Sequence, residues 1–429
     1  MRITQTRASF FLEFTTAENT CSQSPILEIK LDGPPETLKE PNPRWVWCPG
    51  PLIVGAGPSG LATAACLEEK GIPSLILEKD SCIASSWKLR TYERLRLHLP
   101  KQFCQLPFMP FPPELPTYPT KQQFIDYLDA YSKQFSIKPL FGMGVQRAEF
   151  DESIGFWRVQ ANDLEFISRW LIVATGECAE AVVPDIRGIS EFKGQCLHTS
   201  TYKSGEDFRG KKVLVVGCGN SGMEVCLDLC NNEAQPSMVV RDKLHVLPRE
   251  TFWCSTFRLS MWLLKWLPTR LVDGILLVCA RLILGRTEKY GIHRPKIGPL
   301  QLKNTTGRTP VLDVGALAKI RHGQIKVVPG INHFTETGVE YVDGRHEEFY
   351  AVIMATGFKT NVLSWLKEGE FFNKRNGFPK NAFPHSWRGE NGLYATGFTR
   401  RGLLGASLDA HRISDDIASQ WSSKNILQM

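Results

Sequence analysis

The order of apolar and polar stretches between residues 52 and 80 predicts a strand, a helix and a second strand. The apolar run "LIV" precedes the turn "GAGPSG" and a helix of small residues, and the run "LIL" ends the segment at Glu78. Short apolar runs bounded by glycines are typical of buried strands in a parallel sheet. The segment is therefore predicted to be a βαβ unit.

The same pattern returns between residues 211 and 242, where "VLVV" precedes the turn "GCGNSG" and "SMVVRD" ends the unit. The two units align, because 23 positions separate Gly55 from Glu78 and 24 separate Gly217 from Arg241. Each unit is followed by an apolar strand that runs into Ala-Thr-Gly, in "RWLIVATGE" and "YAVIMATGF". The pattern predicts an α/β protein with two nested Rossmann-like dinucleotide-binding domains.

The predicted first domain consists of residues 49–205 and 358–429, because a strand at 391–398 and a terminal helix are expected to return to it. Residues 206–357 are predicted to form the second domain. Residues 1–48 carry proline-rich runs and no sustained periodicity, so we expect a poorly ordered N-terminal extension.

Residues 252–285 are the most apolar part of the chain and are predicted to be a helical insertion in the second domain. Charged residues interrupt them before any run reaches the roughly 20 residues that a membrane span requires. We therefore expect no transmembrane segment and helices that pack over the core. Attachment to a membrane surface is the alternative interpretation.

Composition narrows the classes of partner. The formal net charge of +7 is modest for 429 residues, and no run of Lys and Arg indicates a nucleic-acid site. None of the 12 cysteines forms a CxxC pair, and no Cys/His cluster has the spacing of a metal site. With no secretory signal peptide in view, we expect a cytoplasmic protein with reduced thiols. An organelle transit peptide is an alternative interpretation of the N-terminus, because acidic residues are absent before Glu13. The composition does not indicate which oligomeric state the protein adopts.

The glycines of the first turn predict a nucleotide site. Gly55 permits the tight turn, Gly57 allows the backbone to approach a pyrophosphate, and Gly60 allows the helix to pack closely on the strand. The phosphates would lie at the helix N-terminus, where free N–H groups favour negative charge. Glu78 is suited to accept hydrogen bonds from a ribose; a solvated acid at a strand end is the alternative.

The second turn carries the same glycines, Gly217, Gly219 and Gly222, but ends at Arg241 where the first unit has an acid. A guanidinium can hold a 2′-phosphate with two parallel hydrogen bonds, whereas a carboxylate would repel that phosphate. The second unit is therefore predicted to bind NADPH through Arg241, with Arg249 as the next candidate. FAD is the economical choice for the first unit, and a flavin beside NADPH indicates hydride transfer.

Between the two units, "FKGQCLHTSTY" fits the pattern F-x-G-x-x-x-H-x-x-x-Y through Phe192, Gly194, His198 and Tyr202. This resembles the identifying motif of the flavin-containing monooxygenases, whereas the related Baeyer–Villiger enzymes end the motif in Trp. Considered without the family, His198 is more typical of a satisfied structural histidine than of a base.

The segments "YERLRLHLPKQFCQLPFMPFP" and "ATGFTRRGLLGASLDA" resemble the plant YUCCA-type flavin monooxygenases, and the similarity extends from about Pro51 to the C-terminus. This resemblance implies FAD and NADPH as cofactors, and dioxygen and indole-3-pyruvate as substrates. It further implies oxidative decarboxylation to indole-3-acetate, the auxin, through a C4a-(hydro)peroxyflavin.

The resemblance also suggests site residues. In the broader family, the segment that corresponds to "LHLPK" has an Asn near the flavin, where this chain has His98. His98 is therefore the candidate catalytic residue, since an imidazole can donate a hydrogen bond to the flavin. Arg400 and Arg401 are candidates for holding the substrate carboxylate, and solvated surface charge is the alternative.

Three other functions share parts of this pattern. A disulfide reductase of the flavin type needs a dithiol such as CxxC, which the sequence lacks. A monooxygenase that oxygenates nitrogen or sulfur of another small substrate shares every general motif. A flavin-binding scaffold without turnover would keep the fold but not the activity.

Peripheral attachment to the endoplasmic reticulum is an alternative to a purely cytoplasmic location for any of these enzymes.

Overall fold

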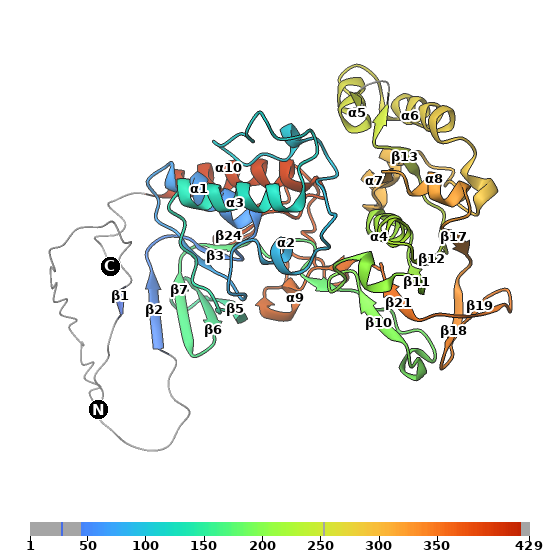
Figure 1. The fold of residues 1–429 in the computed structure, drawn as a ribbon. Helices are drawn as coiled ribbons and strands as arrows, with labels where there is room; N and C mark the ends of the chain where they lie inside the picture. Colours follow the sequence, from blue (N-terminus) through green and yellow to red (C-terminus); the bar gives the residue numbers. More distant parts are fainter. Residues whose placement is uncertain (1–26, 29–43, 252–253, 422–429) are drawn as a thin grey trace, which may run out of the picture.

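The computed structural model describes residues 27–28, 44–251 and 254–421, and these form two lobes that lie side by side (Figure 1). The chain begins in the first lobe, crosses to the second and returns at its C-terminal end, as the nested pattern predicted. The predicted α/β fold is confirmed.

The first lobe has a parallel sheet of four strands at its centre. Along the sheet the order is β24 (Leu393–Ala395), β8 (Leu171–Val173), β3 (Leu52–Val54) and β4 (Leu75–Leu77). Helices α1 (Pro58–Glu68), α3 (Lys121–Gln134) and α10 (Gly402–Gln420) cover one face. Ile53 packs toward these helices, whereas Leu52 and Val54 face the opposite way. Burial on both faces explains why these strands are continuously apolar.

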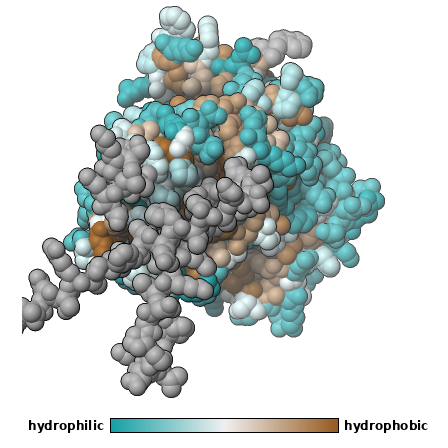
Figure 2. Space-filling model, turned by 90° about the vertical axis from the view of Figure 1, so that its left-hand side faces the viewer, coloured by the Kyte–Doolittle hydropathy of each residue, from teal (hydrophilic) through white to brown (hydrophobic). Residues whose placement is uncertain are grey.

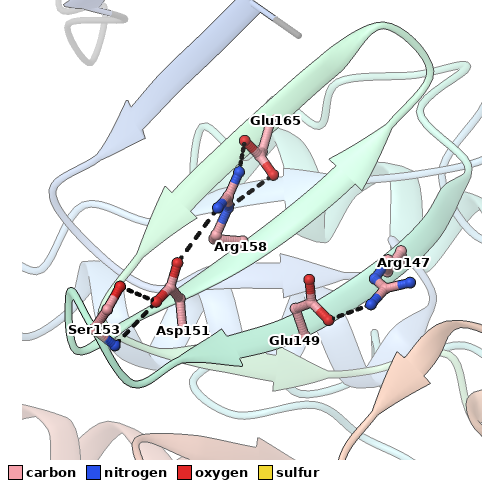
Figure 3. A network of polar contacts seen from close by, with 6 residues as sticks. All are labelled: Arg147, Glu149, Asp151, Ser153, Arg158 and Glu165. Atoms are coloured by element: carbon pink, nitrogen blue, oxygen red, sulfur yellow. Dashed lines mark hydrogen bonds and ion pairs between the residues drawn. The ribbon is translucent and has the colours of Figure 1, made fainter. Parts of the chain in front are cut away.

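A second sheet covers the other face of this lobe. Its order is β1 (Leu27–Glu28), β2 (Arg44–Cys48), β7 (Leu164–Ser168), β6 (Phe156–Ala161), β5 (Val145–Asp151) and β23 (Leu366–Lys367). Arg158 on β6 links its neighbours, with Nη2 2.8 Å from Glu165 on β7 and Nη1 3.3 Å from Asp151 on β5 (Figure 3). Seen from the side of this lobe, hydrophobic side chains gather in the centre of the surface and hydrophilic ones at its margin (Figure 2).

The prediction of a poorly ordered extension up to residue 48 was wrong for residues 44–48. These residues form β2, which pairs in parallel with β7, and Val46 and Cys48 are buried in the sheet. Only two alternating apolar residues of this strand point inward. An alternation this short does not by itself predict a strand, especially next to proline-rich runs. The rest of the predicted extension, apart from β1, lies outside the described residues.

The second lobe is a parallel sheet of five strands. The order is β10 (Gln195–His198), β21 (Ala351–Met354), β11 (Lys212–Val216), β12 (Gln235–Val239) and β17 (Lys326–Val328). Helices α4 (Asn220–Asn231) and α8 (Ala316–Arg321) pack on one face, and the hairpins β18 (Ile331–Phe334), β19 (Gly338–Tyr341) and β20 (His346–Glu348) on the other. Because β10 pairs with β21, this sheet begins before the predicted boundary at residue 206.

The described part of the insertion, residues 254–285, is mainly helical, as predicted. It forms α5 (Thr256–Leu263) and α6 (Thr269–Leu284), which pack on each other and on α7 (Pro299–Thr306) at one end of the second lobe. Among the described residues, no helix is both long and apolar enough to cross a bilayer. Two short helices, α2 (Ser85–Leu89) and α9 (Val362–Trp365), lie in connecting segments. Three pairs of short strands complete the fold: β9 (Glu180–Ala181) with β22 (Phe358–Lys359), β13 (Val246–Pro248) with β16 (Val311–Asp313), and β14 (Glu250–Thr251) with β15 (Cys254–Ser255).

Candidate active site at the boundary of the two lobes

The first glycine turn connects β3 to α1. Gly55 has φ of 110°, a conformation that side chains other than glycine rarely adopt, and a Cβ on Gly60 would collide with the Gly55 carbonyl oxygen. Gly57 differs from both. Its backbone is extended, and a Cβ there would meet no protein atom within 4 Å. The fold therefore requires Gly55 and Gly60, whereas Gly57 leaves open space at the helix N-terminus.

Glu78, directly after β4, is 5% exposed and holds the first turn in place. Its carboxylate accepts hydrogen bonds from Ala56 N at 2.7 Å, Asp80 N at 3.0 Å and Ser85 Oγ at 3.3 Å. A carboxylate offers about four lone-pair sites, so at least one acceptor position remains for a ribose hydroxyl. The sequence predicted a ribose contact for Glu78 and gave no sign of these three hydrogen bonds within the protein.

The second glycine turn connects β11 to α4 and repeats this arrangement. Gly217 has φ of 118°, a Cβ on Gly222 would collide with the Gly217 carbonyl oxygen, and a Cβ on Gly219 would meet nothing within 4 Å. In neither turn does a side chain cap the helix that follows. The free N–H groups at both helix N-termini fit a pyrophosphate.

Arg241 follows β12, and its side chain is 81% exposed. Its guanidinium lies 3.1 Å from the carboxylate of the adjacent Asp242, an exposed pair that contributes little to stability. Its donors are therefore accessible to a phosphate. Arg249, the other candidate, is stacked 4.2 Å from the centre of the Tyr118 ring.

His98 lies in the loop of the first lobe that approaches α4. Its Nε2 is 2.8 Å from Oε1 of Glu224, which lies one turn into α4 from the second glycine turn. Because a carboxylate only accepts, Nε2–H is the donor, and Nδ1 remains available as an acceptor in the neutral imidazole. The sequence analysis missed Glu224, since an acid within a helix has no signal that shows which residue it contacts.

The side chains of Phe192, His198 and Tyr202 in the 192–202 motif make contacts with neighbouring segments of the second lobe. His198 Nδ1 accepts from Ser200 N at 3.1 Å, and Nε2 lies 3.1 Å from the Gly357 carbonyl oxygen, to which it donates. Burial lowers the pKa of His198. Tyr202 donates to Asp228 at 2.6 Å, Phe192 packs on Phe334, and a Cβ on Gly194 would collide with the Phe192 ring. His198 thus has both nitrogens satisfied by the fold.

Comparison with known proteins assigns this architecture to a family. The flavin-binding monooxygenase-like family model matches residues 52–412. The chain belongs to this family. It is 61% identical to "Indole-3-pyruvate monooxygenase YUCCA6" of Arabidopsis thaliana over 87% of this chain and 91% of the relative. It is 56% identical to "Indole-3-pyruvate monooxygenase YUCCA1" of Oryza sativa subsp. japonica, over 89% and 94% of the two chains.

Solved structures confirm the fold of this family member. The flavin-containing monooxygenase from Stenotrophomonas maltophilia superimposes with a TM-score of 0.65 at 22% identity, covering 86% of this chain and 98% of that one. An oxidized steroid monooxygenase bound to NADP gives a TM-score of 0.66 at 18% identity, covering 86% and 85%. These proteins share the two Rossmann-type domains seen here.

A cavity of about 780 Å³ in the described part of the chain lies away from these residues. It is lined by residues of β5, β6 and the segment 367–393, such as Phe150, Trp157 and Arg388, and by none of the predicted site residues. Its position at the start of β24 is opposite to the strand ends from which the glycine turns emerge. In open parallel sheets ligands bind beyond the carboxyl ends of the strands, so we place the active site at the turns.

Proposed function

We propose that the chain is an NADPH- and FAD-dependent monooxygenase that converts indole-3-pyruvate to indole-3-acetate, a step of auxin biosynthesis. The observation that supports two nucleotide sites is the matched pair of glycine turns, each open at its middle glycine. The substrate follows from the high identity with the two indole-3-pyruvate monooxygenases over nearly the whole chain.

The chain's own residues bind and orient the two nucleotides. The N-terminus of α1, beside Gly57, holds the FAD pyrophosphate, and Glu78 accepts from its ribose. The N-terminus of α4, beside Gly219, holds the NADPH pyrophosphate, and Arg241 binds the 2′-phosphate. Bound FAD supplies the redox and oxygen chemistry, so the protein contributes positioning and exclusion of water.

His98 is the candidate catalytic residue, and Glu224 fixes its orientation. The carboxylate of Glu224 is almost fully buried and takes the Nε2 proton of His98 as a hydrogen bond. Leaving the buried Glu224 carboxylate without this hydrogen bond would cost free energy. The contact therefore favours the tautomer of His98 that carries its proton on Nε2. In this tautomer His98 presents Nδ1 to the bound cofactor or substrate as a hydrogen-bond acceptor, so the expected donation to the flavin is not available from the neutral imidazole.

The overall reaction consumes one indole-3-pyruvate, one NADPH, one proton and one dioxygen. It forms indole-3-acetate, carbon dioxide, NADP⁺ and water: one oxygen atom enters the new carboxylate and the other leaves as water. Incubation with ¹⁸O₂ should therefore place one label in the indole-3-acetate carboxylate, measured by mass spectrometry. Release of all dioxygen as hydrogen peroxide would contradict the proposal.

Oxygenation of an amine or a thioether is the second candidate function, because the same nucleotide sites would serve it. Faster NADPH consumption with such substrates than with indole-3-pyruvate would favour it. A scaffold without turnover is tested separately, since NADPH would then fail to bleach the absorbance of the bound flavin.

The protein is proposed to act in the cytoplasm and to contact the surface of the endoplasmic reticulum through α5 and α6. Along α6, Leu271, Ile275, Val278 and Leu282 form one exposed apolar stripe. Trp262 on α5 and Trp266 just after it are also exposed. The exposed cations of this region are Arg258, Lys265, Arg270 and Arg281. Its single acid among residues 254–284, Asp273, is buried and caps α7. Tryptophans and cations around an apolar face are typical of helices that lie on anionic lipid.

A further inference from the structure

Three cationic side chains meet at the boundary of the two lobes. Lys303 comes from α7 of the second lobe, and Arg400 and Arg401 from the turn between β24 and α10 of the first. Within the described parts of the chain, none of these side chains has an ion-pair partner or a hydrogen-bond acceptor.

Backbone contacts hold the cluster in place. Arg400 N donates to Oε1 of Glu177 at 2.7 Å, and the Arg400 guanidinium lies so close to Gly307 that a Cβ there would collide with it. Gly307 N in turn donates to the Lys303 carbonyl oxygen at 2.9 Å, so these two residues are one helical turn apart. Arg400 has φ of 56°, which is strained for an arginine. Strain of this kind is concentrated at functional sites.

The guanidinium groups are stacked on aromatic rings. Arg400 lies 4.4 Å from the centre of the Phe378 ring, and Arg401 lies 3.9 Å from that of Phe383. A stacked guanidinium is held by its face, which leaves its N–H edge available for a carboxylate. Arg400 is half-buried, which makes solvated surface charge the poorer interpretation for it, whereas Arg401 is exposed and held at the rim of the cluster by its aromatic ring.

The local charge balance favours an anion. Among the described residues, Glu177 is the carboxylate that interacts with Arg400 and Lys303, and burial raises the pKa of Glu177. Burial, and then the neighbouring Arg401, lower the pKa of Lys303. A bound anion would relieve the repulsion among the cations. Glu177 follows β8 and the arginines follow β24, so the cluster lies at the carboxyl ends of the parallel strands, where ligands bind.

We propose that Lys303, Arg400 and Arg401 form an anion site that binds the carboxylate of the α-keto acid substrate from both lobes. This assignment rests on the proposed function. A phosphate of NADPH has the same chemistry, so the experiment must separate the two sources. Because one cation comes from the second lobe, substrate binding would also draw the two lobes together.

Equilibrium binding to the FAD-loaded protein, measured without NADPH, tests the site independently of turnover. The probes are indole-3-acetate, its neutral analogue indole-3-ethanol, and NADP⁺. Lys303→Met and Arg401→Met should each raise the Kd of indole-3-acetate roughly ten- to hundredfold, because each removes a charge-assisted hydrogen bond. The Kd values of indole-3-ethanol and NADP⁺ should stay unchanged. Arg401→Lys should weaken binding less than Arg401→Met, since it keeps the charge and loses only the planar fork.

Arg412→Met is the matched control. Arg412 is stacked 5.0 Å from the same Phe383 ring, but its Nη1 donates to the Pro384 carbonyl oxygen at 3.1 Å. An unchanged Kd of indole-3-acetate in the Lys303 and Arg401 variants, with flavin content and melting temperature preserved, would overturn the proposal. So would a rise confined to the Kd of NADP⁺, which would assign the site to a phosphate. If the parent protein discriminates between the two indole probes but does not convert indole-3-pyruvate, the anion site stands and the proposed function fails.

Discussion

His98 Nε2 lies 2.8 Å from Glu224 Oε1, and this contact joins the loop of the first lobe to the helix that begins in the second glycine turn. Burial, and then the same carboxylate, raise the pKa of the neighbouring Tyr92. The pair therefore connects the candidate catalytic residue to the element that is proposed to bind NADPH.

A double-mutant cycle with His98→Ala and Glu224→Ala should give a coupling free energy of about 1–3 kcal/mol, because each single change removes the same charge-assisted hydrogen bond. Chemical denaturation of the four proteins measures it. The same cycle with Lys88→Ala and Asp129→Ala, a more exposed pair at 2.7 Å, should give a smaller value. Additive effects of the His98 and Glu224 changes would show that the contact contributes nothing to stability.

Gly57→Val should abolish FAD binding without unfolding the protein. The extended backbone at this position accepts any residue, and the new side chain would occupy the space left for the pyrophosphate. The ratio of flavin to protein after gel filtration measures retention, and circular dichroism measures folding. Gly219→Val is the matched control, since it should keep FAD and lose NADPH affinity. Stoichiometric FAD in the Gly57 variant would contradict the assignment of this turn.

Arg241→Ala should reduce the preference for NADPH over NADH roughly ten- to hundredfold, since a hydrogen bond to a charged group contributes about 1.5–3 kcal/mol. The ratio of kcat/KM for the two nucleotides measures this preference. Lys243→Ala, a change of another exposed cation two residues away, should leave the ratio unchanged. An unchanged ratio in the Arg241 variant would place the phosphate contact elsewhere.

Asp409→Asn should stabilise the protein near neutral pH. Asp409 is 1% exposed, its Oδ1 has no hydrogen-bond partner among the described residues, and burial raises its pKa to about 7. The folded-state pKa lies above the unfolded value, so Asp409 contributes its full stability in acid. That contribution falls as pH rises from about 4 to about 7.

The gain in melting temperature from Asp409→Asn should therefore be largest at pH 7–8 and vanish near pH 4, corresponding to a free energy on the order of 2–4 kcal/mol. Asp415→Asn serves as control, because Asp415 lies on the same helix with an exposed carboxylate. A gain that is independent of pH would show that Asp409 is not the titrating group.

Leu282→Ser should weaken binding to vesicles of phosphatidylcholine and phosphatidylserine roughly tenfold, because Leu282 is 74% exposed on the apolar stripe of α6. Co-sedimentation at low and high salt measures the binding, which added salt should reduce. Val342→Ser changes a side chain that is 66% exposed on the other side of the lobe, and should have no effect. Failure of the parent protein to bind these vesicles would contradict the proposed membrane contact.

The sequence by itself determined the two βαβ units and the spacing of their glycines. Both depend on local properties: apolar runs that are buried on both faces, and backbone positions such as Gly55 that only glycine adopts easily. It also indicated the difference between Glu78 and Arg241, because each follows its turn at nearly the same distance along the chain.

Only the tertiary structure decided which residues from distant segments meet. Glu224 is 126 positions from His98, and no periodicity within α4 shows that this acid faces a loop of the other lobe. No local pattern shows that Lys303 and Arg401 lie close together either. The five residues of β2 become a strand only because β7 provides the hydrogen-bonding edge. Contacts between lobes depend on how the sheets pack, which involves many weak interactions summed over the whole chain and no local pattern.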